Sequence, residues 1–189
     1  MAISSKTQTE GTTSWKLDPA HTLVEFTAKH MMITNVRGRF TNVEGSIEVD
    51  EHDADASSVA VELDAASVDT RVEQRDQHLR SADFLDVENF PKVTFRSTKV
   101  EGASFEPGES FRVVGDLTIR GTTREVVLDA TFGGRGPDPW GGERVGFSAE
   151  TKIDRRDFGL TWNAALETGG VLVGNEVKIR IEAEAVLER

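Results

Sequence analysis

Arg75, Asp76 and His78 lie close together in a segment with helical sequence character, and side chains of these types can transfer protons. Arg75 and His78 are neighbours at positions i and i+3, and Asp76 is placed to pair with Arg80 at i+4. General acid–base catalysis also needs a tuned pKa and a substrate within reach, which spacing does not supply. The chain has no Gly-x-Ser-x-Gly elbow and no P-loop, so it offers no recognisable nucleophile. We therefore expect no catalytic residues and interpret these groups mainly as anchors of the helix.

His21 and His30 suggest metal binding, because imidazole is a common metal ligand. Nine positions separate the two residues, an odd number, so in a regular strand they point to opposite faces. The chain also has no cysteine and no His-x-His pair. We expect no metal site and predict a hydrogen-bonded structural role for His21. His30 ends an apolar face, and contact with the polar end of a ligand is the alternative for it.

The segment with the clearest helical sequence pattern runs from residue 70 to residue 86. Thr70 and Glu73 form a capping-box pattern, which predicts that the helix begins near residue 71. Val72, Asp76 and Leu79 share one face, so a stripe that should face the interior carries a polar group. We therefore expect this helix to lie over an opening rather than deep in a core.

The rest of the chain alternates between apolar and polar residues, which predicts short β-strands. The expected strands span residues 23–30, 36–40, 43–49, 59–63, 93–97, 111–119, 125–132, 145–153 and 177–185. Turn-forming residues at 106–109 and 120–123 join neighbouring strands as hairpins, so these strands must be antiparallel. Residues 133–142, rich in glycine and proline, are expected to form a loop, and residues 154–174 a longer irregular segment.

This pattern predicts an all-β fold, an antiparallel up-and-down barrel of about eight strands with a short helical insertion. The inward residues are valine, isoleucine, phenylalanine and leucine with several small residues among them. An interior of this kind suits an apolar ligand, but the same residues are also typical of a packed core. Periodicity leaves both alternatives open.

The chain has 189 residues and a net charge of −11, enough length for one domain with a full core. The acidic balance argues against nucleic-acid partners and against docking on anionic lipid surfaces, although it does not exclude a lipid held inside. Residues 1–14 are rich in serine, threonine and glutamine without an apolar stretch, so we expect a disordered N-terminal extension rather than a signal peptide. No run approaches the roughly 18 apolar residues of a membrane span, and we expect a cytoplasmic protein.

Four blocks of sequence, taken in order, are similar to those of the YceI-like family. They comprise residues 18–26 with 29–32 and 36–40, residues 75–86 with 90–91 and 95–97, residues 115–123, and residues 156–160. The resemblance covers residues 15–189 and implies a lipocalin-like barrel whose lumen holds a long apolar chain, such as a polyisoprenoid or a fatty-acid derivative. It also implies frequent dimerisation. Many relatives are periplasmic, whereas this sequence leads us to expect a cytoplasmic location.

On these grounds we expect a non-catalytic barrel that binds and sequesters or carries a lipid, with no cofactor other than that lipid. The residues expected to contact the ligand are apolar or lie at the ends of apolar faces: Phe26, His30, Met32, Phe40, Leu79, Phe84, Leu85, Phe95, Leu117, Ile119, Phe147, Phe158, Trp162 and Ile179. One alternative is an enzyme acting on a bound lipid or quinone-like substrate, with His78, Asp76 or His30 as acid–base groups. A third possibility is a barrel with a packed lumen that serves as an interaction module.

Overall fold

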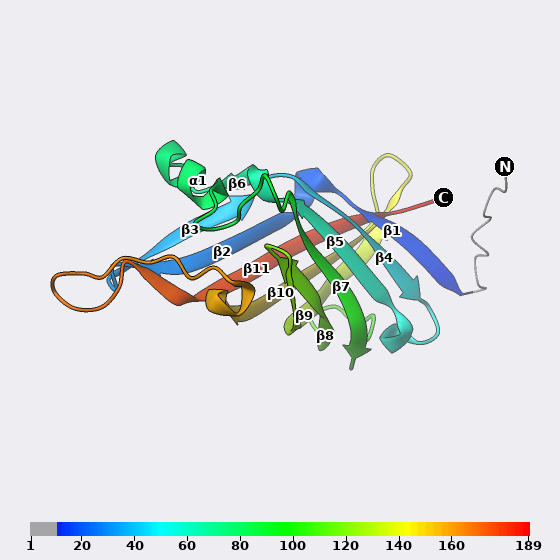
Figure 1. Ribbon diagram of the computed structural model, residues 1–189. Helices are drawn as coiled ribbons and strands as arrows, with labels where there is room; N and C mark the ends of the chain where they lie inside the picture. Colours follow the sequence, from blue (N-terminus) through cyan, green and yellow to red (C-terminus); the bar gives the residue numbers. More distant parts are fainter. Residues whose placement is uncertain (1–10) are drawn as a thin grey trace, which may run out of the picture.

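The computed structural model describes residues 11–189, which form a barrel of antiparallel strands with one short helix beside it (Figure 1). The strands are β1 (Thr12–Leu17), β2 (Leu23–His30), β3 (Thr34–Phe40), β4 (Val43–Asp50), β5 (Ser58–Asp64), β6 (Val68–Asp69), β7 (Lys92–Glu101), β8 (Ser110–Ile119), β9 (Thr122–Pro137), β10 (Glu143–Asp154) and β11 (Val173–Leu187). The helix is α1 (Glu73–Arg80), and the short 3-10 helices are η1 (Pro19–His21), η2 (Ala54–Ala56), η3 (Ala65–Ser67) and η4 (Arg155–Phe158). In this part of the chain, no helix is long and apolar enough to cross a bilayer.

Eight strands close the barrel in the order β1-β4-β5-β7-β8-β9-β10-β11, because β1 also pairs with β11. From β4 to β11 each barrel strand pairs with the next barrel strand along the chain, and every pairing is antiparallel. The remaining strands, β2, β3 and β6, continue the sheet outward from β11 and form what we call the wing. The predicted antiparallel barrel of about eight strands is therefore confirmed.

β1 closes the barrel between β4 and β11, and Trp15 lies at the centre of this seam. Its backbone is paired with Ile47 on one side and with Leu187 on the other. The indole is fully buried, its nitrogen donates a hydrogen bond of 2.9 Å to Thr13 Oγ1, and the Arg135 guanidinium lies 4.9 Å from the ring centroid. A large apolar ring with one satisfied polar atom is well suited to this buried position.

Two expectations about strand boundaries are wrong. Strand β1 includes residues 12–14, which belong to the expected disordered extension. Residues 1–10 of that extension lie outside the described part of the chain. Strand β9 runs to Pro137, so residues 133–137 of the expected loop are paired with β10, and only residues 138–142 form the turn. The ladder shifts register between Gly146 and Phe147, and Gly134 has a φ of 139°. Glycines in this stretch thus accommodate an irregular strand rather than a loop.

The helix begins at Glu73 rather than near residue 71, and the predicted capping box does not form. Val72 is the N-cap residue and makes no side-chain capping bond. The Thr70 hydroxyl and backbone N–H instead both donate to Asp76 Oδ1, at 2.5 and 2.9 Å. The Glu73 carboxylate accepts hydrogen bonds from Gln77 and Arg80, so it does not reach back to the cap.

Buried polar contacts hold α1 beside β6 of the wing. Asp76 is only 4% exposed, and Arg75 donates to the hydroxyl and the carbonyl oxygen of Thr70, at 2.7 and 2.9 Å. The expected Asp76–Arg80 pair is wrong, because Arg80 donates to Glu73 and to the backbone carbonyls of residues 66 and 68. These groups are nevertheless anchors, as expected, since they join α1 to η3 and β6.

Replacing Asp76 by alanine should lower the free energy of unfolding by about 2–4 kcal/mol, because the Thr70 donors would stay buried without an acceptor. Urea titrations of the purified variant would measure this loss. Gln74→Ala, an exposed change on the same helix, should alter stability by less than about 0.5 kcal/mol. Equal stability of the two variants would show that the buried contacts do not hold the helix.

Candidate ligand-binding site

The interior of the barrel contains a cavity of about 320 Å³ whose walls are almost entirely apolar. Leu79, Phe84 and Phe158 line it at one end, which we call the helix end, while Ser58 and Phe105 line it at the other, the loop end. Strand β8 runs from the loop end to the helix end of the cavity. It starts after the 102–109 loop and ends at Ile119. The next residue, Arg120, donates a 3.0 Å hydrogen bond to the Phe84 carbonyl at the helix end. A cavity of this volume falls at the lower end of the range for small-molecule sites.

Alternation along the strands creates the apolar walls, and small residues keep them thin. On β11, Val177, Ile179, Ile181 and Ala183 all line the cavity, as their spacing of two predicts. On β8, Gly115 leaves room for a neighbouring ring: a Cβ at this position would lie 2.5 Å from Cζ of Phe95. A larger residue at this position would displace the Phe95 ring, which lines the cavity.

Eleven of the fourteen residues expected to contact a ligand line this cavity. They are Phe26, Phe40, Leu79, Phe84, Leu85, Phe95, Leu117, Ile119, Phe147, Phe158 and Ile179. The structure thus brings together residues from β2, β3, α1, β7, β8, β10, β11 and the segments that follow α1 and β10. Their contact with a ligand stays a prediction.

The other three candidates, His30, Met32 and Trp162, lie outside the cavity lining. His30 is half-buried at the end of β2, and Met32 is 60% exposed in the following turn, with a left-handed φ of 62°. Trp162 packs against the helix end from outside, with its ring centroid 4.6 Å from that of His78 and 5.4 Å from that of Phe84. It belongs to the cover of the cavity rather than to its wall.

The possible acid–base groups also lie away from the cavity. Asp76 is occupied by Thr70, and His78 is held between aromatic rings, with its Nε2 2.9 Å from Asp83 Oδ2. Among the described residues, only Glu25 and Arg155 are ionisable members of the lining. The charged groups that suggested catalysis from the sequence are therefore not part of the cavity lining.

Arg155 is buried, and its guanidinium donates to four backbone carbonyl groups. The acceptors belong to residues 160 and 162, at 2.6 and 2.9 Å, and to residues 173 and 174, at 3.3 and 2.9 Å. Burial lowers the pKa of Arg155. Since its donors point to the backbone, this side chain joins the irregular segment after η4 to the start of β11.

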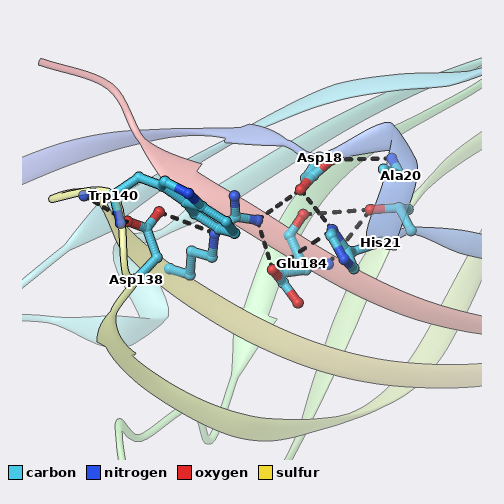
Figure 2. A network of polar contacts seen from close by, with 9 residues as sticks. Asp18, Ala20, His21, Asp138, Trp140 and Glu184 are labelled. Carbon is cyan, nitrogen blue, oxygen red and sulfur yellow. Dashed lines mark hydrogen bonds and ion pairs between the residues drawn. The ribbon is translucent and has the colours of Figure 1, made fainter.

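Figure 2 shows a second polar cluster, at the turn between β1 and β2, that includes Asp18, His21 and Glu184. One nitrogen or oxygen atom of each of these side chains lies within 4.8 Å of those of the other two. Three such residues resemble a metal-binding group. Arg144 Nη1, however, donates to Asp18 Oδ2 at 2.6 Å and to Glu184 Oε1 at 2.7 Å, and His21 Nδ1 lies 2.8 Å from Asp18 Oδ2. The guanidinium supplies the positive charge that these carboxylates need, so the cluster is an ion-pair network. His21 has the hydrogen-bonded role that we predicted.

Arg144 also controls the titration of this network. Its hydrogen bond, followed by that of His21, lowers the pKa of Asp18 to about 2 from an ordinary value of 3.8. The two carboxylates in turn raise the pKa of Arg144. Hydrogen bonds from the backbone N–H groups of Gly142 and Trp140, together with Arg144, lower the pKa of Asp138. The network therefore joins the turn after β1 to β10, β11 and the β9–β10 turn.

Sequence analysis missed the residues at the loop end of the cavity: Ala54, Ser57, Ser58, Ala103, Ser104 and Phe105. Most are small or polar and lie in connections, where alternation gives no signal. Phe105 is the exception, because it is a large apolar residue. Its place directly before the Glu-Pro-Gly turn is the one signal that the sequence offers for this end of the cavity. Phe111 and Val113 were also missed, although they continue the inward spacing of Leu117 and Ile119.

The fold and the cavity define a class of protein, the antiparallel barrel that encloses an apolar binding site. Residues 15–185 match the model of the YceI-like domain, so the chain belongs to this family. Protein YceI of Salmonella newport is 38% identical over 169 residues, which are 89% of this chain and 83% of that protein.

Solved structures show the same architecture. The YCEI protein of Campylobacter jejuni superimposes with a TM-score of 0.71 at 34% identity, covering 85% of this chain and 90% of the other. A domain of Saccharophagus degradans described as polyisoprenoid-binding has a TM-score of 0.71 at 15% identity, over 93% of this chain and 99% of the other. At that identity, the second likeness supports the fold alone.

Replacing Ile179 by aspartate should destabilise the fold by at least about 3 kcal/mol or abolish folding, because an unpaired carboxylate would be forced into an apolar cavity. Lys178→Asp introduces the same group one position away, on the outer face, and should change stability by less than about 1 kcal/mol. Thermal unfolding followed by circular dichroism compares the two. A stable Ile179→Asp variant that unfolds like its parent would contradict the inward register of β11.

The Asp18 network should produce a defined pH dependence. Because the folded-state pKa of Asp18 is depressed, its stabilising contribution is present above the ordinary value of 3.8 and is lost as pH falls through about 2. Asp18→Asn should therefore have a lower Tm than the parent at pH 7, and the difference should shrink between pH 4 and pH 2. Asp116→Asn, an exposed control, should show no such convergence. A difference for Asp18→Asn that stays constant with pH would contradict this assignment.

Proposed function

We propose that this protein binds a long apolar ligand, a polyisoprenoid or a fatty-acid-like chain, in the barrel cavity and sequesters or carries it without chemical change. The observation that supports the proposal is the cavity itself, which runs between the two ends of the barrel and has almost no polar surface. Transfer of apolar ligand surface from water into such a site is favourable by roughly 25 cal/mol per Å². A lining of this kind also offers few hydrogen-bond partners to a polar molecule.

The chemistry of the surrounding charged groups supports a non-catalytic role. An enzyme acting on a bound lipid or quinone-like substrate would need an acid or base against the reacting atoms. His78, Asp76 and His30 do not line the cavity, and the Arg155 donors are directed at backbone carbonyls. Glu25, the other ionisable member of the lining, lies opposite Arg180 and Arg39 on the neighbouring strands. A packed lumen that serves only for protein interaction is disfavoured by the volume left open inside. The carrier role accounts for the cavity best.

We also propose that the protein works as a homodimer in the cytoplasm. Family resemblance supports the dimer, and the sequence expectation described above supports the location. Light scattering coupled to size-exclusion chromatography measures the first, and fractionation of cells expressing the full-length protein measures the second. Neither property is needed for the binding role.

Native mass spectrometry of the protein as purified, followed by organic extraction, should reveal a bound chain lipid, and the delipidated protein should take up a fluorescent prenol or fatty acid. Ala149→Phe places a ring in the cavity and should weaken uptake at least about tenfold, because the added volume displaces the ligand. Lys152→Phe, an exposed position on the same strand, is the matched control and should bind like the parent. Thermal unfolding of both variants establishes that they fold.

The same assay separates binding from catalysis. His78→Ala and His30→Ala should leave the lipid chemically unchanged during incubation, as the parent does, with chromatography of the extract as the measurement. A product formed by the parent and lost in His78→Ala would favour the enzyme. Absence of any bound lipid, together with no uptake of either probe, would overturn the carrier proposal.

A further inference from the structure

The cavity reaches solvent-exposed residues at only one of its ends. Among the described residues that line it, Ser58 and Phe105 alone are exposed, and both belong to the loop end. Phe105 is 39% exposed, a large value for an aromatic ring that lines an apolar cavity. The other large apolar side chains exposed in the described chain, such as Met32 and Trp140, do not line it. Phe105 is therefore placed between the cavity and water.

The helix end is closed by well-buried side chains. Phe84, Leu85, Phe158 and Leu160 all line the cavity there and are between 2% and 9% exposed. The segment after α1 is further fixed by the hydrogen bond from Arg120 to the Phe84 carbonyl. Opening this end would expose several apolar side chains at once, each at a cost of roughly 1.5–3 kcal/mol.

The loop of residues 102–109, which we call the entrance loop, is held more lightly. Its Phe105 ring meets Phe132 edge to face, with centroids 6.2 Å apart, and the Ala103 N–H donates a 2.8 Å hydrogen bond to Asp55 of η2. The loop lies between Gly102 and Gly108, which have φ values of 72° and 90° and open space where a Cβ would be. Two backbone hydrogen bonds, from the Gly108 N–H to the Phe132 carbonyl at 2.8 Å and from the Phe132 N–H to the Glu109 carbonyl at 3.0 Å, join the end of the loop to β9. Unlike the side chains that close the helix end, residues 102–109 are all half-buried or exposed.

The charges around this end are negative. Asp53, Asp55, Glu106 and Glu109 make no ion pair with any residue between 11 and 189. Lys99 of β7 and Arg112 of β8, the cations of these two strands that are nearest to the loop in sequence, both lie beside Glu101, at 2.7 and 4.0 Å. An anionic head group held at this end would meet an excess of carboxylates. Binding would be opposed because like charges would lie side by side.

We infer that the loop end is the entrance of the cavity and that Phe105 covers it. The ligand lies with its tail toward α1, and its uncharged polar head, such as an alcohol, lies beside the entrance loop. The apolar lining requires a polar head to stay outside the cavity, and the carboxylates disfavour a diphosphate or a carboxylate in that place. This inference rests on the proposed function, since it assigns the direction and the head-group class of the ligand bound there.

The charge selectivity can be tested with two probes of equal chain length, geranylgeraniol and geranylgeranyl diphosphate, in competition with a fluorescent prenol at low salt. The parent protein should bind the alcohol at least about tenfold more tightly than the diphosphate. The double variant Glu106→Lys with Glu109→Lys should reduce this ratio at least about fivefold, because it reverses the local charge. Asp116→Lys with Glu125→Lys makes the same change in net charge on the outer faces of β8 and β9, and should leave the ratio close to that of the parent.

The position of the head group can be measured directly, because the chain has no cysteine and single cysteines can be introduced for labelling. A fluorophore attached to Ser104→Cys in the entrance loop should be quenched by a prenol that carries a nitroxide at its head. The same fluorophore attached to Glu88→Cys, an exposed position after α1, should be quenched much less. Phe105→Ala should also speed ligand exchange, while Trp140→Ala, exposed but outside the lining, should not.

The outcomes distinguish this inference from the proposed function. If no probe binds to the parent, the carrier proposal fails. If both probes bind but quenching is stronger at position 88, the carrier proposal stands and the inferred entrance is overturned. If both probes bind but the two double variants change the ratio of alcohol affinity to diphosphate affinity equally, the carrier proposal stands and the inferred head-group class is overturned.

Discussion

The pairing of β1 with both β4 and β11 is the constraint on which the rest of the structure depends. Without it, β4 and β11 would present open sheet edges, and water would reach the interior between them. Trp15 fills this seam with no exposed surface, and its indole nitrogen still finds an acceptor in Thr13. The Arg144 network then fixes the turn that follows β1. A binding cavity exists because a single six-residue strand completes the ring.

Polar groups in this protein are used to position elements, and the binding surface is left apolar. Asp76 and Arg75 fix the helix, Arg155 fixes the segment before β11, and Arg144 fixes the turn beside the seam. Each of these charges has hydrogen-bond partners, as a buried or half-buried charge requires. This division accounts for the polar clusters of the sequence as groups that hold the elements of the fold together.

The barrel could be predicted from sequence because alternation is a local property: residues 177, 179 and 181 of β11 show their inward face without knowledge of any neighbour. The predicted lining residues on strands, such as Phe95 and Phe147, followed for the same reason. The capping box failed because a tertiary contact, the hydrogen bond from Thr70 to Asp76, took the hydroxyl away from the helix terminus. The loop end of the cavity and the extension of β9 through Pro137 depend on how connections are placed in space, and local patterns do not encode that.

The apolar cavity also has a consequence for the lifetime of the protein. Side chains around an empty space lose packing contacts, so the ligand-free barrel sacrifices folding free energy that an occupied barrel recovers. A ligand that binds only the folded state stabilises it by mass action, and folded populations determine how fast cellular proteases remove a protein. For the lipid that we propose for the cavity between Phe84 and Phe105, this coupling would make the abundance of the protein follow the supply of ligand.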